Sequence, residues 1–118
     1  MNIRFLTLLL AVFIAAEAHA NCGLTPTPPA FLEQAQIQAE AVEASKAELE
    51  TYFETVDTYL ACVDEQIAQI APADAPMEYY DSPEYQSQFD GFKALTDMAE
   101  STRDIAVERY NYLLTITN

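Results

Sequence analysis

The stretch LETYFETVDTYLACVD, from Leu49 to Asp64, sets the fold of this chain because its apolar residues recur with alternating spacings of four and three. That spacing places apolar side chains on one side of an α-helix and is typical of helices that pair as coiled coils. The pattern extends in both directions and is interrupted at Lys46. Its members are Leu32, Ala35, Ala39, Val42, Leu49, Phe53, Val56, Leu60, Val63, Ile67 and Ile70. Since no glycine or proline occurs from Ala30 to Ala71, we predict a first helix over about residues 35–71.

A proline-rich loop, residues 72–82, follows this helix and ends it, because proline removes a backbone donor and clashes with the preceding turn. Ser82 and Pro83 suit the N-cap and first turn of a second helix, which we expect over about residues 83–116. Two helices of similar length joined by a short loop pack most simply as an antiparallel hairpin. The sequence therefore predicts an all-α fold, a coiled-coil-like two-helix hairpin.

The apolar stripe of the second helix is wider than one partner helix can cover. Its centre consists of Phe92, Leu95, Ala99, Thr102, Ala106, Leu113 and Ile116. The residues that widen it are Phe89, Met98, Ile105, Tyr110 and Tyr112. This surplus favours dimerisation into a four-helix bundle or docking to another protein. Packing of an N-terminal segment would use the same surface, so the oligomeric state stays open.

Residues 1–20 have the pattern of a cleaved signal peptide. Arg4 precedes an apolar run from Phe5 to Ala16, and Ala18 to Ala20 form a small-x-small cleavage site before Asn21. The apolar run is shorter than the roughly 20 residues that a membrane-spanning helix needs. We therefore expect a secreted or periplasmic product. The net charge of −14 disfavours nucleic acid and anionic membranes as partners and favours cationic ones.

Cys22 and Cys62 are expected to form a disulfide, because an exported chain meets an oxidising compartment. Cys62 lies on a mostly uncharged face of the first helix, between the apolar face and an acidic one. This face consists of Ser45, Glu48, Tyr52, Thr55, Tyr59, Cys62 and Gln66. Its composition suits a surface that another segment covers, and the proline-rich start of the chain is the nearest candidate.

Chain geometry connects the disulfide to the start of the first helix. An extended segment advances about 3.1 Å per residue and a helix about 1.5 Å, so the cysteines meet within one chain only if the helix begins no earlier than about residue 35. We therefore expect residues 21–34 to form an extended tail packed on the uncharged face. A helix start at Pro28 or Pro29 would instead require an intermolecular disulfide.

These features resemble those of a loose group of small, uncharacterised secreted bacterial helical proteins. The similarity rests on an early cysteine before a Pro-rich stretch, a helical segment ending in Tyr-Leu-x-Cys, and an Arg-Tyr-Asn motif near the C-terminus. The matching residues are Cys22, Pro26, Pro28, Pro29, the segment from Leu49 to Cys62, and Arg109 to Asn111. The resemblance implies the helical fold and the disulfide, and it implies no activity.

Catalytic constellations are missing from residues 21–118, which contain no histidine. Neither a Ser-His-Asp nor a Cys-His arrangement can therefore be built there. Carboxylates such as Asp64 and Glu65 are expected on a solvated face, where nothing shifts their pKa values for acid-base catalysis. We predict no enzymatic activity, no catalytic residue, no metal site and no cofactor.

The segment MEYYDSPEY, from Met77 to Tyr85, has the most unusual local composition. Tyrosines flanked by carboxylates are suited to contact a cationic partner, so this segment is a candidate interaction patch. The alternative is a loop whose tyrosines fold back over the open end of the hairpin. Its acids do not match the D-x-[DN]-x-[DN]-G loop, so specific Ca²⁺ binding is not expected. The patch consists of Tyr79, Tyr80, Asp81, Glu84 and Tyr85.

Three basic residues, Lys46, Arg103 and Arg109, fall on the apolar sides of the two helices. We expect them to extend along the apolar surface and pair with acids of the facing helix, which would fix the register. Binding of an anionic ligand is the alternative.

The function favoured by the sequence is that of a non-enzymatic, acidic helical protein that acts through protein-protein interaction or self-association. The alternative is a protein that binds or buffers divalent cations with its acidic face. The sequence identifies neither the partner nor the pathway.

Overall fold

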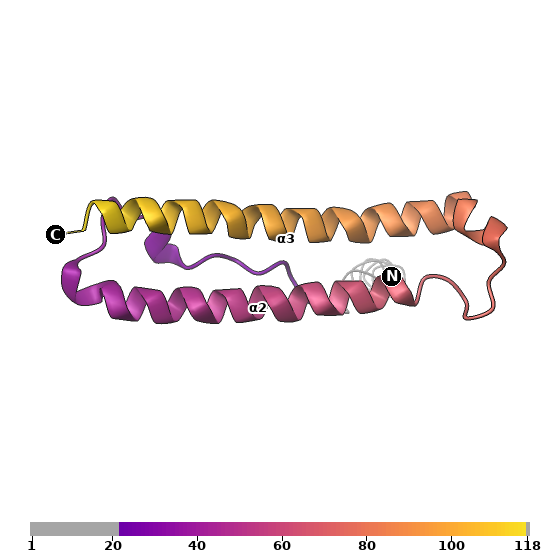
Figure 1. The fold of residues 1–118 in the computed structure, drawn as a ribbon, viewed down its shortest axis with the longest axis horizontal. Helices are drawn as coiled ribbons and strands as arrows, with labels where there is room; N and C mark the ends of the chain where they lie inside the picture. The colour runs from indigo at the N-terminus through magenta and orange to yellow at the C-terminus, as the bar shows by residue number, and fades with distance from the viewer. Residues whose placement is uncertain (1–21, 118) are drawn as a thin grey trace, which may run out of the picture.

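The computed structural model describes residues 22–117, which form two long helices lying side by side and antiparallel (Figure 1). Helix α2 spans Val42–Ala68 and helix α3 spans Pro83–Thr115. Three short 3-10 helices accompany them: η1 (Ala30–Glu33), η2 (Ala39–Ala41) and η3 (Met77–Asp81). No strand occurs among these residues, so the predicted all-α hairpin is confirmed. The signal peptide predicted over residues 1–20 lies outside the described part of the chain.

Residues 22–38 form an extended segment, here called the tail, that runs between the two helices (Figure 1). The tail starts beside the second half of α2, runs toward the end where α2 begins, and turns there into the helix. It is interrupted only by the single turn of η1. The expected extended tail on the first helix is therefore present, and it contacts α3 as well.

Helix α2 is shorter than the sequence predicts. It begins at Val42 rather than near residue 35, and it ends at Ala68 rather than near residue 71. Alanine and glutamine are good helix formers, and their abundance around residues 34–41 favours a helix that begins before Val42. The predicted start near residue 35 is wrong because local helix propensity does not decide the conformation of these residues.

Two buried side chains explain why the chain stays extended before Val42. Leu32 is 6% exposed and Ile37 is 3% exposed, and both belong to the apolar core. Burying an aliphatic side chain of this size contributes about 1.5–3 kcal/mol. Helix propensities differ by less than about 1 kcal/mol per residue among ordinary residues. Packing of the tail into the groove between the helices therefore outweighs the helical preference of its alanines and glutamines.

The buried side of α2 includes residues of both the predicted apolar face and the predicted uncharged face. Its buried residues again follow a four-three spacing, but they include serine and tyrosines of the uncharged face as well as aliphatic residues. They are Ser45, Leu49, Tyr52, Val56, Tyr59 and Val63. Phe53 and Leu60, which belong to the predicted apolar pattern, are only partly buried. The helix is rotated relative to the predicted orientation because its buried side contacts both the tail and α3.

The fully buried core lies in the part of the hairpin that the tail covers. On α3 the buried residues are Ala99, Ala106, Tyr110 and Leu113, and none precedes Ala99. On α2 none follows Val63. Toward the loop, residues such as Ile67 and Phe92 pack against the core while remaining partly exposed. A two-helix seam buries its side chains completely only where a third segment fills the groove.

Helix α3 begins at the cap that the sequence predicts. The Ser82 side-chain oxygen accepts a hydrogen bond of 3.2 Å from the backbone N–H of Tyr85, and its hydroxyl donates to the Tyr79 carbonyl at 2.6 Å. Pro83 occupies the first turn, where its missing N–H is not needed. Neither α2 nor α3 has an apolar stretch of the length and hydropathy required to cross a membrane.

Candidate interaction surfaces

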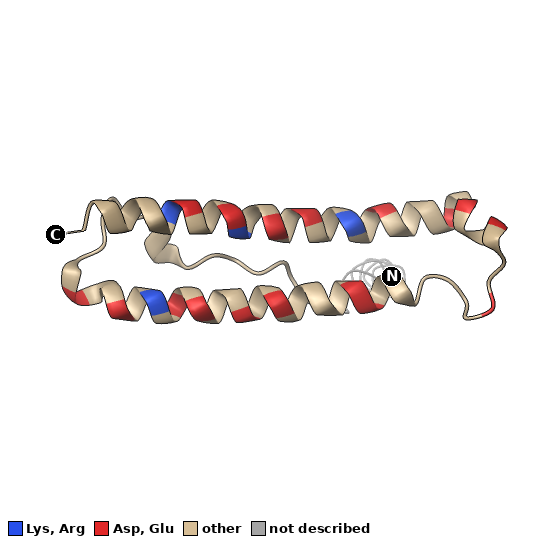
Figure 2. Cartoon of the chain, in the orientation of Figure 1, with Lys and Arg blue, Asp and Glu red and all other residues tan. Residues whose placement is uncertain are grey.

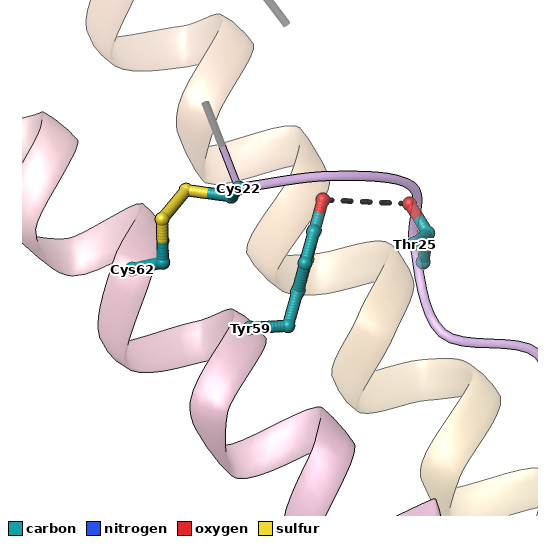
Figure 3. The surroundings of a disulfide bond; sticks show 4 residues. All are labelled: Cys22, Thr25, Tyr59 and Cys62. Atoms are coloured by element: carbon teal, nitrogen blue, oxygen red, sulfur yellow. Dashed lines mark hydrogen bonds between the residues drawn. A yellow bond between two sulfur atoms is a disulfide. The ribbon is translucent and has the colours of Figure 1, made fainter. Parts of the chain in front are cut away.

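The disulfide joins Cys22 to Cys62 within one chain, with an S–S distance of 2.06 Å and a Cα–Cα distance of 5.6 Å (Figure 3). The intramolecular pairing favoured by the geometric argument is therefore observed. One turn earlier on α2, the Tyr59 hydroxyl lies 3.4 Å from the Thr25 hydroxyl oxygen (Figure 3). These two contacts fix the N-terminal part of the tail on the tyrosine-bearing face of α2.

Arg109 fixes the other part of the tail to α3. Its Nε donates a hydrogen bond of 2.8 Å to the Leu32 carbonyl oxygen, and one terminal nitrogen donates a bond of 2.7 Å to the Gln34 carbonyl oxygen. Beside it, the Phe31 and Tyr110 rings meet edge to face at 6.0 Å. The prediction that Arg109 pairs with an acid on the facing helix is wrong, because its guanidinium donates to backbone carbonyls of the tail instead.

The other two basic residues behave differently. Arg103 forms the expected bridge between the helices, with a terminal nitrogen 3.6 Å from an Asp57 carboxylate oxygen. Lys46 is exposed and takes no part in the core, so its predicted core position is wrong. The rotation of α2 brings Ser45 and Leu49 inward and leaves Lys46 in solvent.

Tyr52 places a phenol in the core between the tail, α2 and α3. Its side chain is buried, and its hydroxyl oxygen has no hydrogen-bond partner among the described residues. Burial raises the pKa of Tyr52 above its usual value of 10.0, and the nearby Arg103 partly offsets the effect. The neutral phenol is therefore the form that the folded protein holds.

The rings of the predicted patch gather at the loop end of the hairpin. Tyr80 and Tyr85 lie 5.0 Å apart, Tyr79 contacts both, and Phe89 stacks on Tyr85 at 5.9 Å. The Tyr79 hydroxyl points to the Ile70 carbonyl oxygen at 3.4 Å, beyond the end of α2. The tyrosines thus fold over the end of the hairpin, as the alternative interpretation expected.

The outer edge of this ring cluster remains accessible. Tyr80 is an exposed large apolar residue, and Asp81 and Glu84 are exposed beside it. The structure therefore brings together the three tyrosines of the candidate patch, while its two acids face solvent. Tyr79 therefore caps the hairpin, while the ring of Tyr80 stays exposed to solvent.

Shallow grooves follow both sides of the tail. On the α2 side, two adjoining grooves of about 490 and 510 Å³ share Pro26, Thr51 and Thr55 in their lining. On the α3 side, a groove of about 260 Å³ lies between Pro28, Pro29 and the helix, with Ile105 in its wall. The tail contributes no charged side chain to these grooves before Glu33.

Large apolar side chains remain in solvent on α3 after the tail and α2 have packed. Met98 is 56% exposed, Ile105 is 62% exposed and Tyr112 is 53% exposed. They follow one another at intervals of seven residues, so they lie along one line of the helix. The sequence places all three among the residues that widen the apolar stripe beyond its centre. Val107 and Leu114, on the other side of the buried face of α3, are exposed to a smaller extent.

Acidic residues recur along the length of both helices, and few basic residues lie among them (Figure 2). Among residues 22–117, no group of three or more histidine, cysteine, aspartate or glutamate side chains is arranged to hold a metal ion. Comparisons with protein-family models, with curated proteins and with solved structures find no match to this chain.

Proposed function

We propose that this protein is a non-enzymatic, secreted or periplasmic helical-hairpin protein that acts by binding another protein. The observation that carries the proposal is the line of exposed apolar side chains on α3, Met98, Ile105 and Tyr112. Single exposed apolar residues are common on protein surfaces. A regularly spaced line of three, left open after the core is complete, is typical of an interaction surface.

Export of the chain is supported by two independent features. The sequence begins with the pattern of a signal peptide, and the disulfide between Cys22 and Cys62 suits an oxidising compartment. Intact mass tests this part of the proposal. Protein purified from the periplasm should begin at Asn21, weigh two hydrogens less than its reduced form, and accept two alkyl groups only after reduction. A protein retaining residues 1–20 would contradict it.

Site-specific photo-crosslinking in the cell tests the binding function. A photoreactive side chain is placed at Ile105 on the exposed line, at Tyr80 on the ring cluster, and at Glu50 on the acidic outer side of α2 as a matched control. We expect a discrete protein adduct from position 105 or 80, the same species from repeated preparations, and none from position 50. A protein that is monomeric by light scattering and gives no adduct at any position would overturn the proposal.

A further inference from the structure

A second line of residues runs beside the exposed apolar line of α3. Met98 and Ile105 are each preceded by an aspartate, and Tyr112 is preceded by an asparagine. One heptad before Met98, the same two positions hold Asp90 and Gly91. The pairs are Asp90 with Gly91, Asp97 with Met98, Asp104 with Ile105, and Asn111 with Tyr112. All eight of these residues are exposed. A seven-residue interval is two turns of helix, so each line runs nearly parallel to the helix axis.

This arrangement has the composition of one half of a coiled-coil interface. In such interfaces apolar side chains at heptad spacing form the seam, and the charges flanking the seam determine which helices can pair. The groove of about 260 Å³ between α3 and the tail widens the seam, since Ile105 lines it together with Pro28 and Pro29. An apolar side chain of an incoming helix would find contact on both walls of this groove.

The charge beside the seam disfavours a second copy of this chain as the occupant. Asp90, Asp97 and Asp104 make the flank predominantly acidic, and like charges across a helix pair are destabilising. The basic residues nearby are already engaged: Lys93 lies 3.5 Å from Asp97, and Arg109 is bound to the tail with its guanidinium 5.3 Å from the Tyr112 ring centre. The net charge of −14 adds a general repulsion between copies.

We propose that the exposed line of α3 docks a basic amphipathic helix of a partner protein. The partner helix would carry apolar residues at alternating spacings of three and four, facing Met98, Ile105 and Tyr112. Lysine or arginine beside that stripe would face Asp90, Asp97 and Asp104. This inference rests on the proposed function, because it identifies the site and the chemistry of the protein partner.

A synthetic helix tests the inference directly. The probe is a labelled peptide of about three heptads with leucine at its seam positions and lysine at the flanking positions. A matched peptide carries glutamate in place of lysine. Binding to the full-length, oxidised, mature protein is measured by fluorescence anisotropy at about 0.05 and 0.15 M salt, where exposed charge pairs are screened to different extents. We expect saturable 1:1 binding of the lysine peptide, weakened at the higher salt, and no binding of the glutamate peptide.

Surface variants locate the site. Ile105→Gln should weaken binding of the lysine peptide by about tenfold or more, since an apolar contact at the centre of a seam is worth more than about 1.4 kcal/mol. Asp104→Asn should weaken it by about two- to threefold, as expected for one exposed charge pair. Val107→Gln is the matched control, because Val107 is 37% exposed and lies two residues on, at the opposite side of the helix. It should leave binding unchanged.

Circular dichroism establishes that each variant is folded, and the substituted side chains are outside the core. The inference is overturned if neither peptide binds, if both bind equally, or if Val107→Gln weakens binding as much as Ile105→Gln. A dimer that Ile105→Gln dissociates would make a second copy the occupant and would equally overturn it. A photo-crosslink from position 80 with no peptide binding would remove this site while retaining the proposed function. Absence of any crosslink together with absence of peptide binding would remove both.

Discussion

Removing the disulfide should destabilise the protein more than any other change at a partly exposed position. In the double variant Cys22→Ser, Cys62→Ser, the unfolded chain is released from a cross-link between residues 40 positions apart. The chain-entropy relation gives about 4 kcal/mol at 25 °C for a closed loop of this length. The expected loss in the free energy of unfolding is therefore about 2–4 kcal/mol, allowing for the shortfall that such cross-links commonly show.

The structure indicates that the variant keeps its fold. Leu32 and Ile37 remain available to fill the groove, and Arg109 still donates to the tail carbonyls. Most of the loss should consequently come from the unfolded state, which becomes less restricted. A domain of this size has about 5–15 kcal/mol of total stability, so a loss of this size is easily measured.

Urea denaturation followed by circular dichroism is the assay, comparing the double variant with the oxidised protein at one protein concentration. The slope of unfolding free energy against urea should increase slightly, because the unfolded chain without a cross-link exposes more surface. Wild-type protein that is reduced and alkylated under unfolding conditions provides a second form without the bond, and it should behave like the double variant. A loss below about 1 kcal/mol would refute the reasoning that the bond limits the unfolded chain.

Four further variants test individual contacts. Tyr52→Phe should leave the free energy of unfolding unchanged or raise it by up to about 1 kcal/mol, because the buried hydroxyl has no partner. Burial raises the pKa of Tyr52 in the folded protein, so the phenol of the unfolded chain ionises first and wild-type stability should fall as the pH rises above 10.0. The Tyr52→Phe variant should lack this part of the decline. Arg109→Met should cost about 2 kcal/mol and speed hydrogen exchange in the tail, whereas Arg103→Met, which removes a partly exposed ion pair, should cost less than about 1 kcal/mol. Ser82→Ala should cost about 1 kcal/mol in urea denaturation by removing the N-cap of α3, and an unchanged midpoint would show that Pro83 alone sets the start of the helix.

The hairpin could be predicted because its signals lie in neighbouring residues. The disulfide could be predicted because two cysteines allow one intramolecular pairing. The four-three spacing from Leu49 onward favours one helix, and the prolines after residue 71 end it without reference to the rest of the fold. Since Cys22 and Cys62 are the two cysteines of the sequence, only one intramolecular pairing exists. Chain geometry then placed the tail on α2 correctly.

The start of α2 and its rotation could not be predicted from the same spacing. Residues around Ile37 have a helical composition, and their extended conformation depends on a groove that exists only after α2 and α3 pair. Periodicity likewise identifies the apolar face of α2, but it does not show which part of that face contacts the tail and which part contacts α3. The contacts of Arg109 were missed for a related reason, since the backbone carbonyls that accept its hydrogen bonds leave no mark in the sequence.

The candidate surfaces were predicted in part. The membership of Met98, Ile105 and Tyr112 in a wide apolar stripe could be seen in the sequence, and so could the concentration of tyrosines before Pro83. How much of each side chain remains exposed depends on where the tail and α2 pack against α3. That packing involves distant segments, which a single sequence does not display.

The long separation between Arg109 and the tail also determines the order of assembly. Its bond to the Leu32 carbonyl joins residues 77 positions apart, whereas the two helices meet across a short loop. Contacts between distant residues form late, so we expect the hairpin to pair within microseconds to milliseconds and the tail to dock afterwards. Disulfide formation takes seconds to hours. Until the tail has docked, the groove is open and prone to aggregation, and mutual repulsion between copies of net charge −14 disfavours their association at that stage.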